Sequence, residues 1–551
     1  MGEKLLDAYG IEVQLTREQN ACITYTGEKT LIIKGLAGTG KSLLLAAIAI
    51  KKYRESTTIK QNKIAIFTYQ TSLISTMQEI LLKNDIPQNS IYVGTIQSYA
   101  NKLYEGMEER GIVSKNEYIE QNSYNLKIKR NFVKKALIIF QQEYGYHHYT
   151  KIDTDIWIEE FNWMKDMNIW TDNKQYFLDL VDENTRIEEH MTQHEKELIY
   201  YIYCLYCDLL AETNQAEYID QILTMNRKAE DVQESDKFDY VLVDEGQEYS
   251  NAQIQFIHHI AKETVYIAMD INQKLYEKSW RIQQIGIESV TRKLSQTMRM
   301  TTAIDELAES LRTQNDKYLN VDDRILNFAS KKEGQMPQII QFEDSIEEKE
   351  YMQKTVKKCL ADDDTNTIGI IASTKLSLET YMGWLTEVRI PFEVITPDTP
   401  YTYNTTGVKI VTVYGAKGLE FDYVIIPQFV EGVFPFTFKH TVEEEEKFYY
   451  KMRNLVYLAM TRAKKNLVLT MGGKNRSRFI EELIPTGYEW FGADKPEPKT
   501  MYSDTSRVKP KQSSESEDKM NLTGSSNVGI MEYLKNQGVE FIDKRVIDRE
   551  S

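Results

Sequence analysis

The chain has 551 residues, of which 41% are hydrophobic and 27% are charged, and its formal net charge is −16 at pH 7. This length allows three or four domains with ordinary apolar cores. The negative charge excludes nonspecific coating of nucleic acid by the whole surface, because such affinity comes from Lys and Arg neutralising phosphates. It leaves room for a local basic channel.

No stretch approaches the roughly 18 uncharged apolar residues of a membrane span, and the charged start MGEKLLDAYG lacks the apolar core of a signal peptide. Four cysteines are too few for a disulfide framework, so a reducing, cytoplasmic location without a membrane partner is expected. Cys204 and Cys207 form an isolated C-x-x-C in a helical pattern. Without a second ligand pair nearby, a buried helix face is favoured there over a metal site.

Residues 30–50, TLIIKGLAGTGKSLLLAAIAI, place a glycine-rich loop between an apolar strand and an apolar helix. The loop matches G-x-x-x-x-G-K-[ST], in which glycines let backbone N–H groups face phosphate oxygens. Lys41 should reach the outer phosphates and Ser42 should hold Mg²⁺, while the helix N-terminus adds its positive dipole end. The sequence therefore predicts binding of ATP with Mg²⁺ by Gly35, Gly38, Thr39, Gly40, Lys41 and Ser42.

Three apolar strand patterns, TLIIKG, KIAIFTY and SIYVGT, alternate with helical patterns up to about residue 100, which is typical of a parallel sheet covered by helices. From 101 to 230 the strand signal disappears and a Tyr-rich sequence with a helical period predicts an inserted helical subdomain. Strands return with YVLVDE and VYIAMD and close the first sheet. The first nucleotide-binding domain is thus expected to cover 1–100 and 231–290.

A second series of strand patterns fills residues 291–491 with PQIIQF, TIGIIAS, PFEVIT, VKIVTVY, YVIIPQF and NLVLTM. The fold class is therefore expected to be α/β, with two nucleotide-binding sheets in tandem and a helical insertion in the first. Beyond them, 492–527 is rich in Pro, Ser, Lys and Glu and predicts a flexible tether. Residues 528–551 regain a short helix and strand pattern, which is typical of a docking element or of a frayed terminus.

The segment YVLVDEGQE delivers two acids to the end of an apolar strand. Nucleotide hydrolysis needs a carboxylate for the metal and a group that activates water. Asp244 is the candidate that holds Mg²⁺ through water, and Glu245 is the candidate general base. A strand that ends in acids is common, so this pair gains its meaning from the phosphate loop.

Taken in order, these motifs resemble those of superfamily 1 helicases and translocases of the UvrD/Rep/PcrA type, over about residues 12–475. The resemblance implies two RecA-like domains that hydrolyse ATP between them. Arginines from the second domain would reach ATP held by the first, where such groups are worth roughly 10³ to 10⁵ in rate. The motifs nominate Gln19 (LTREQ) for adenine, Gln273 (MDINQKLY) as γ-phosphate sensor, Arg299 (LSQTMR) and Arg462 (RNLVYLAMTRAKK) for phosphate, and Glu420 (TVYGAKGLEFD) for the ribose. The alternative for either arginine is a surface salt bridge.

The same resemblance implies a track for single-stranded nucleic acid along the motif loops, where bases stack on aromatic faces. Any one aromatic would more often belong to a core, but their clustering on motif loops favours the track. The candidates are Phe67, Thr95, Tyr99, Tyr276, Trp280, Thr412 and Tyr414.

The chain departs from the family pattern at several positions. Gln97 and Tyr414 replace histidines, and Met298 replaces a common Tyr. These departures bear on substrate preference and coupling, since none touches the hydrolytic groups. Only about 110 residues separate the Arg299 motif from TVYGAKG, which leaves no room for a full second accessory domain. Translocation on single strands is therefore favoured over robust unwinding by the chain alone.

The leading hypothesis is an ATP-dependent motor that translocates on single-stranded DNA, with the 3′ to 5′ polarity that the resemblance implies. One alternative is an RNA-directed or polymerase-displacing motor of the same superfamily, because grooves and stacking tolerate both sugars. Another is an ATPase switch that senses nucleic acid or nucleotide and controls a partner enzyme through the tail. The sequence shows no nuclease constellation of its own, so any nuclease is expected to be such a partner.

Overall fold

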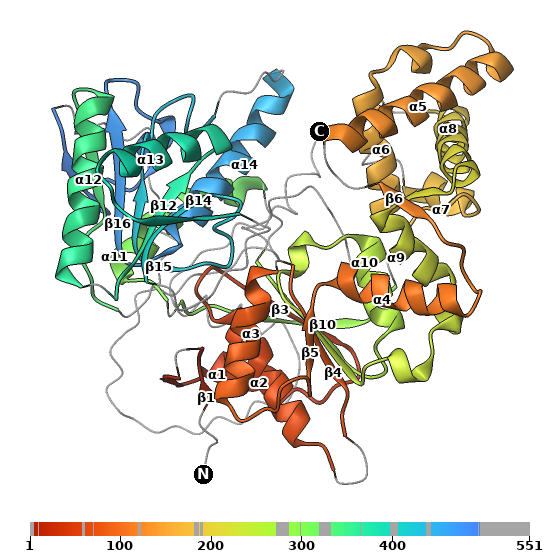
Figure 1. The fold of residues 1–551 in the computed structure, drawn as a ribbon, viewed down its shortest axis with the longest axis horizontal. Helices are drawn as coiled ribbons and strands as arrows, with labels where there is room; N and C mark the ends of the chain where they lie inside the picture. The colour runs from red at the N-terminus through yellow and green to blue at the C-terminus, as the bar shows by residue number, and fades with distance from the viewer. Residues whose placement is uncertain are drawn as a thin grey trace, which may run out of the picture. The chain divides into compact units, whose positions relative to one another are not determined.

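The structure is a computed structural model that describes residues 5–495, except for 9, 58–60, 70, 120–122, 181–186, 188–190, 271–285, 298, 319–331, 364, 397–405, 437–441 and 494. The chain divides into one unit of residues 1–507 and another of 508–551. The second unit lies outside the described residues, as do most of the predicted tether at 492–527 and all of the predicted docking element at 528–551. The described part contains two large parallel sheets with helices packed on them (Figure 1).

The first sheet has six strands in the order β10-β3-β9-β8-β4-β5, all paired in parallel. All residues of β4 and β9 are buried, because helices cover both faces of a parallel sheet. Five of the six strands were predicted from the sequence, which confirms the α/β fold class. The strands are β3 (Thr30–Gly35), β4 (Ile64–Phe67), β5 (Tyr92–Gly94), β8 (Tyr240–Val243), β9 (Val265–Met269) and β10 (Ser289–Leu294).

Strand β10 shows that the expected domain boundary at residue 290 is too early. Its six residues pair with β3, from Ser289 opposite Thr30 to Leu294 opposite Gly35, so the first sheet continues through residue 294. Its polar sequence, SVTRKL, gives a weak apolar signal because β10 is an edge strand with exposed side chains.

Two apolar clusters cover the two faces of this sheet. Side chains of β4 alternate between them, since Ile64 and Ile66 join one cluster and Ala65 and Phe67 join the other. The first cluster includes α1 (Arg17–Ile23), α2 (Lys41–Arg54) and α3 (Ser72–Lys83), and the second includes α4 (Ile96–Glu109), α9 (Tyr218–Arg227) and α10 (Asn251–His259). A short antiparallel pair, β1 (Leu5–Leu6) and β2 (Glu12–Val13), precedes α1.

The helical insertion has a core of its own. Trp157 and Trp163 are buried in it. Its helices are α5 (Ser123–Tyr144), α6 (Thr154–Asp166), α7 (Lys174–Leu180) and α8 (Gln193–Glu212), which lie together in Figure 1. Helices α4 and α9, near the ends of the predicted insertion at 101–230, instead pack on the first sheet. A parallel pair, β6 (Glu117–Ile119) and β7 (Gln215–Glu217), joins the two parts.

Cys204 and Cys207 lie on α8, partly buried against this core, which confirms the helical interpretation of the C-x-x-C. Within the described ranges no group of His, Cys, Asp or Glu has the arrangement of a metal site. In the same residues no helix combines the length and apolarity that crossing a membrane requires.

The second sheet has seven parallel strands in the order β13-β14-β12-β15-β16-β11-β17. It contains all six predicted strands and adds β17 at its edge. The strands are β11 (Gln338–Phe342), β12 (Thr367–Ala372), β13 (Phe392–Ile395), β14 (Gly407–Thr412), β15 (Phe421–Ile426), β16 (Ala463–Gly472) and β17 (Glu489–Phe491). The covering helices are α11 (Thr302–Arg312), α12 (Ser345–Asp362), α13 (Lys375–Glu387) and α14 (Val442–Met460). The described elements between β10 and β14 all belong to this domain.

A buried charge network ties the insertion to α9 on the first sheet. Lys165 of α6 is 1% exposed, and its Nζ lies 2.7 Å from Glu217 Oε2 and 2.8 Å from Asp220 Oδ1. Lys129 of α5 lies 2.5 Å from the other oxygen of Glu217. Burial acts to raise the pKa of Glu217, but the two ammonium groups outweigh it and hold that pKa at about 2. The network therefore depends on full pairing of its charges.

We expect Lys165→Met to lower the free energy of unfolding of the insertion by about 3 to 5 kcal/mol, because it leaves buried carboxylates underpaired. Urea denaturation followed by tryptophan fluorescence checks this, since Trp157 and Trp163 report on that core. The control is Lys174→Met, whose side chain is 47% exposed beside Glu197 and should matter by less than about 1 kcal/mol. Equal effects of the two substitutions would contradict the prediction.

Candidate active site

The phosphate loop turns between β3 and α2 and depends on two glycines. Gly38 and Gly40 have φ of +77° and +74°, in the left-handed region that favours glycine. Neighbours also crowd both positions. A Cβ at Gly38 would lie 3.0 Å from Cβ of Arg299, and one at Gly40 would lie 3.0 Å from Nε2 of Gln19. The loop is thus held between two residues that the sequence nominated for the nucleotide site.

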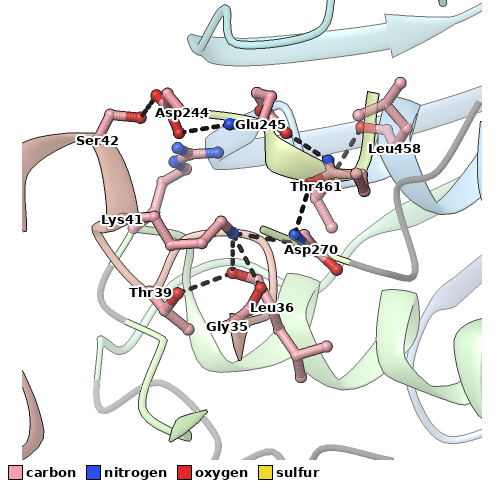
Figure 2. Close-up of polar contacts among 12 residues, drawn as sticks. Gly35, Leu36, Thr39, Lys41, Ser42, Asp244, Glu245, Asp270, Leu458 and Thr461 are labelled. Atoms are coloured by element: carbon pink, nitrogen blue, oxygen red, sulfur yellow. Dashed lines mark hydrogen bonds and ion pairs between the residues drawn. The ribbon is translucent and has the colours of Figure 1, made fainter. Parts of the chain in front are cut away.

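The ammonium group of Lys41 lies at the mouth of this loop. Its Nζ donates to the carbonyls of Gly35, at 2.9 Å, and Leu36, at 3.0 Å, and lies 3.8 Å from Asp270 Oδ2 (Figure 2). Thr39 closes the turn by donating from Oγ1 to the Leu36 carbonyl at 2.9 Å. A cation at a helix N-terminus, among glycines that leave backbone N–H groups accessible, is suited to the phosphates of a nucleotide.

Ser42 and Asp244 meet although 202 residues separate them in the chain. Ser42 Oγ donates to Asp244 Oδ2 at 2.5 Å, and the other carboxylate oxygen accepts from the Glu245 N–H at 2.9 Å (Figure 2). Burial, together with the charge of Glu245, raises the pKa of Asp244 to about 6. A hydroxyl beside a carboxylate is the oxygen donor set that Mg²⁺ prefers, so these two residues fit the metal that accompanies a nucleotide.

Glu245 follows β8 in a strained conformation, with φ of +53° at a residue that is not glycine. Its Oε2 accepts from Gln247 Nε2 at 2.5 Å, and Gln247 Oε1 in turn accepts from the Asp270 N–H at 2.9 Å. Burial acts to raise the pKa of Glu245, but Lys417 and Lys41 outweigh it and lower that pKa. The carboxylate is therefore held ionised and oriented, as a general base requires.

Lys417 brings the second domain into this cluster of acids. It lies in the turn after β14, is 2% exposed, and places Nζ 2.6 Å from Glu248 Oε1 and 3.4 Å from Glu245 Oε2. Glu248 has no exposed surface. Both residues lie inside the motifs YVLVDEGQE and TVYGAKGLEFD, which predicted no role for them. The signal was present, because a lysine between the apolar residues of TVYGAKGLEF is expensive to bury without a partner.

The two nominated arginines have different surroundings. Arg299 Nη2 lies 2.6 Å from Glu420 Oε1, and both side chains are about one-fifth exposed. Glu420, predicted near the ribose, is thus the ion-pair partner of Arg299 in this structure. Arg462 is 2% exposed, which excludes the surface salt bridge for this residue. Burial, followed by the charge of Arg299, lowers the pKa of Arg462 to about 10.

Arg462 is held by carbonyl and hydroxyl oxygens at the end of α14. Its guanidinium donates to the carbonyls of Leu458, at 3.0 Å, and Leu419, at 3.3 Å, and to Thr461 Oγ1 at 3.2 Å. A buried guanidinium held by neutral acceptors keeps its charge available for an anion.

Gln19 packs directly on the phosphate loop. The side-chain Oε1 of Gln19 accepts from the Thr16 backbone N–H at 2.8 Å, and the Gln19 backbone N–H donates to Thr16 Oγ1 at 3.1 Å. These two hydrogen bonds form a capping box at the start of α1. Gln19 Nε2 donates to the Thr39 carbonyl at 3.0 Å. The structure therefore places Gln19 at the nucleotide loop, and its contact with adenine stays a prediction.

The predictions for Phe67 and Tyr99 as stacking platforms are wrong. Phe67 is 0% and Tyr99 is 2% exposed, and their rings pack on each other and on Phe238. The reason is that β4 is an interior strand covered on both faces, so its last side chain points into the core under α4. The unbroken apolar run IAIF, typical of a doubly covered strand, was the signal.

Three other candidates for the strand track have local structural roles. Thr95 caps α4 by accepting from the Ser98 N–H at 3.1 Å, and Thr412 Oγ1 accepts from the Gly415 N–H at 3.2 Å. Tyr414 is half-buried against the core of the second domain. Their contact with nucleic acid stays a prediction. Gln273, Tyr276 and Trp280 lie outside the described residues.

Family comparisons match both halves of this architecture. The UvrD/REP helicase N-terminal domain matches residues 15–294, just over half of the 551 residues. The UvrD-like helicase C-terminal domain matches residues 398–473. The chain belongs to the UvrD/Rep helicase family. The first match ends with β10, in agreement with the corrected boundary of the first domain.

Individual relatives are similar over short segments. A probable DNA helicase II homolog from Rickettsia conorii is 41% identical over 87 residues, which cover 14% of this chain and 13% of the relative. The ATP-dependent DNA helicase PcrA from Leuconostoc citreum is 34% identical over 109 residues, which cover 17% of this chain and 14% of that relative. The chain thus matches about one-seventh of the length of these relatives. The C-terminal domain of a possible DNA helicase from Lactobacillus plantarum, a solved structure, is 19% identical over 35% of this chain and 98% of that one, with a TM-score of 0.26.

We expect Lys417→Met to slow ATP hydrolysis about a hundredfold, because Glu245 loses the cation that holds its charge and position. Steady-state turnover at saturating ATP checks this. The matched control is Lys465→Met, also in the second domain, whose side chain is 59% exposed beside Asp422 and should leave turnover unchanged. Wild-type turnover in Lys417→Met would remove Lys417 from the hydrolytic site.

Proposed function

We propose that the protein is an ATP-dependent motor that moves along single-stranded DNA and hydrolyses ATP between its two RecA-like domains. The observation that carries this proposal is the contact of Lys417, from the second domain, with Glu245 and Glu248 of the first. Because of this contact, residues from both domains form the cluster that is proposed to hydrolyse ATP.

Each residue of the cluster has a chemical task in this proposal. The loop at Gly35–Ser42 and the ammonium of Lys41 bind the phosphates. Mg²⁺, when bound with the nucleotide, supplies positive charge, and Ser42 and Asp244 are the residues suited to hold it. Glu245 accepts the proton of the attacking water, while Arg299 and Arg462 stabilise charge on the phosphates.

Hydrolysis at a junction of two domains favours a mechanical output. Groups from both domains bind the same phosphates, so ATP favours closure and loss of the outer phosphate favours opening. If the two domains alternate in their grip on a strand, this cycle moves the protein along it. The 3′ to 5′ direction rests on the family resemblance.

DNA is the proposed substrate because the relatives are described as DNA helicases. Movement along one strand is favoured over unwinding by the chain alone. The described residues between β10 and β14 are used by the second domain itself, through helices such as α12 and α13, rather than by an accessory domain.

We expect single-stranded DNA to stimulate ATP hydrolysis, and we expect Lys41→Ala and Glu245→Gln each to abolish it. Glu245→Gln should still bind ATP, because it removes the base and leaves the loop intact. The measurement is ATP hydrolysis at matched low salt without nucleic acid, with single-stranded DNA and with single-stranded RNA, together with ATP binding by each variant.

The alternatives give different outcomes in the same experiment. Stimulation by RNA alone would replace DNA with RNA as the substrate. A rate indifferent to both nucleic acids would indicate an ATPase switch that controls a partner enzyme. Hydrolysis retained in either variant would contradict the assignment of the site.

We also expect Arg462→Lys to lower the turnover number at least about 10³-fold, because lysine cannot reproduce the planar set of donors that meets a phosphoryl group. Steady-state hydrolysis at saturating ATP measures it. The control is Arg453→Lys in α14, the helix that precedes Arg462; the Nε atom of Arg453 lies 2.5 Å from Glu482 Oε2. Similar losses in both variants would assign Arg462 a structural role.

A further inference from the structure

The crossover between the two domains carries one of the phosphate-binding candidates. Its described residues are 295–297 and 299–301, between β10 and α11, and they include Arg299. Arg299 lies close to the phosphate loop, since a Cβ atom placed on Gly38 would lie 3.0 Å from the Cβ atom of Arg299. The contacts that hold the crossover in place therefore also determine the position of Arg299 relative to the phosphate loop.

A carboxylate from the first domain holds the start of this crossover with both of its oxygens. Glu18 Oε2 accepts from the Ser295 N–H at 2.8 Å, and Glu18 Oε1 accepts from Ser295 Oγ at 2.6 Å. The two residues are 277 positions apart. Two hydrogen bonds to a charged acceptor define orientation as well as distance, and each is stronger than a neutral hydrogen bond.

The helix that carries Glu18 is itself attached to the phosphate loop. Glu18 lies next to Gln19, whose Nε2 donates to the Thr39 carbonyl at 3.0 Å. The rigid first turn of α1, closed by its capping box, thus links the loop at one residue and the crossover at the next. Glu18 itself makes its two hydrogen bonds to Ser295.

The far end of the crossover is attached to the second domain. Thr297 Oγ1 donates to Asp305 Oδ2 of α11 at 2.7 Å, and Met300 is buried in the core of that domain. Ser295 is therefore held by the first domain and Thr297 by the second. The last pair of β10 with β3 is Leu294 with Gly35, so the Glu18 contact extends the hold of the first domain to Ser295, on the side of the crossover that leads to Arg299.

From these contacts we infer that Glu18 is a positioning residue for ATP hydrolysis, which keeps Arg299 against the phosphate loop by holding Ser295. The inference rests on the proposed function, since it concerns the same hydrolysis. It assigns a task to a residue that lies outside the phosphate-binding and hydrolytic groups.

The test is a double-mutant cycle between Glu18→Ala and Arg299→Ala, read as kcat and KM for ATP. In the wild-type background we expect Glu18→Ala to lower kcat about tenfold to a hundredfold, because a displacement of about 1 Å is that costly, with KM changed less than about twofold. In the Arg299→Ala background the same change should lower kcat less than about twofold, because Glu18 acts through Arg299.

Two further variants sharpen the result. Glu18→Gln should recover most of the lost kcat, because a carboxamide still accepts from the Ser295 N–H and donates to Ser295 Oγ. Arg17→Ala, an exposed position on the same turn, should match the wild type. If Glu18→Ala fails to fold, Ser295→Ala removes one of the two hydrogen bonds and gives the same cycle.

The inference is overturned if Glu18→Ala lowers kcat by the same factor in both backgrounds, or if it raises KM and leaves kcat unchanged. Wild-type kcat in Glu18→Ala overturns this inference alone, provided that the wild type shows hydrolysis that Lys41→Ala abolishes. Absence of such hydrolysis in the wild type overturns the proposed function and this inference together.

Discussion

The structure depends on the neutralisation of buried acids at the end of β8. Asp244 is 1% exposed and Glu248 has no exposed surface, with Glu245 between them. Removing a carboxylate from water costs several kcal/mol unless a cation or hydrogen-bond donors replace the water. Lys41 of the loop supplies part of that compensation, and Lys417 supplies another part from the other domain. The proposed hydrolytic site and the domain contact are therefore one set of interactions.

Sheet topology explains why these groups meet. In the first sheet β3, β9 and β8 are neighbours and parallel, so their carboxyl ends lie at the same edge. The phosphate loop follows β3, Asp270 follows β9 and Asp244 follows β8. Residues that are 202 positions apart, Ser42 and Asp244, are thus brought within hydrogen-bonding distance. This is the general location of ligand sites in open parallel sheets.

Polar contacts between distant segments hold the parts around this edge. Glu18 links α1 to the crossover at Ser295, and Lys165 links the insertion to α9. In both contacts a charged side chain binds partners on another element, so the stabilisation from each contact is lost if that element moves. Such charge-assisted contacts define one arrangement more strictly than apolar packing, which tolerates small displacements.

The sequence by itself determined the features that depend on neighbouring residues. The phosphate loop, the acids after YVLV and eleven predicted strands follow from local spacing and apolar periodicity. Only the tertiary structure decided which side chains are buried and which distant residues pair with one another. It buried Phe67 and Tyr99, extended the first sheet through β10, and paired Lys417 with Glu248 across 169 residues. The physical reason is that periodicity reports which side of an element is apolar, whereas burial and ion pairing depend on which distant segment packs there.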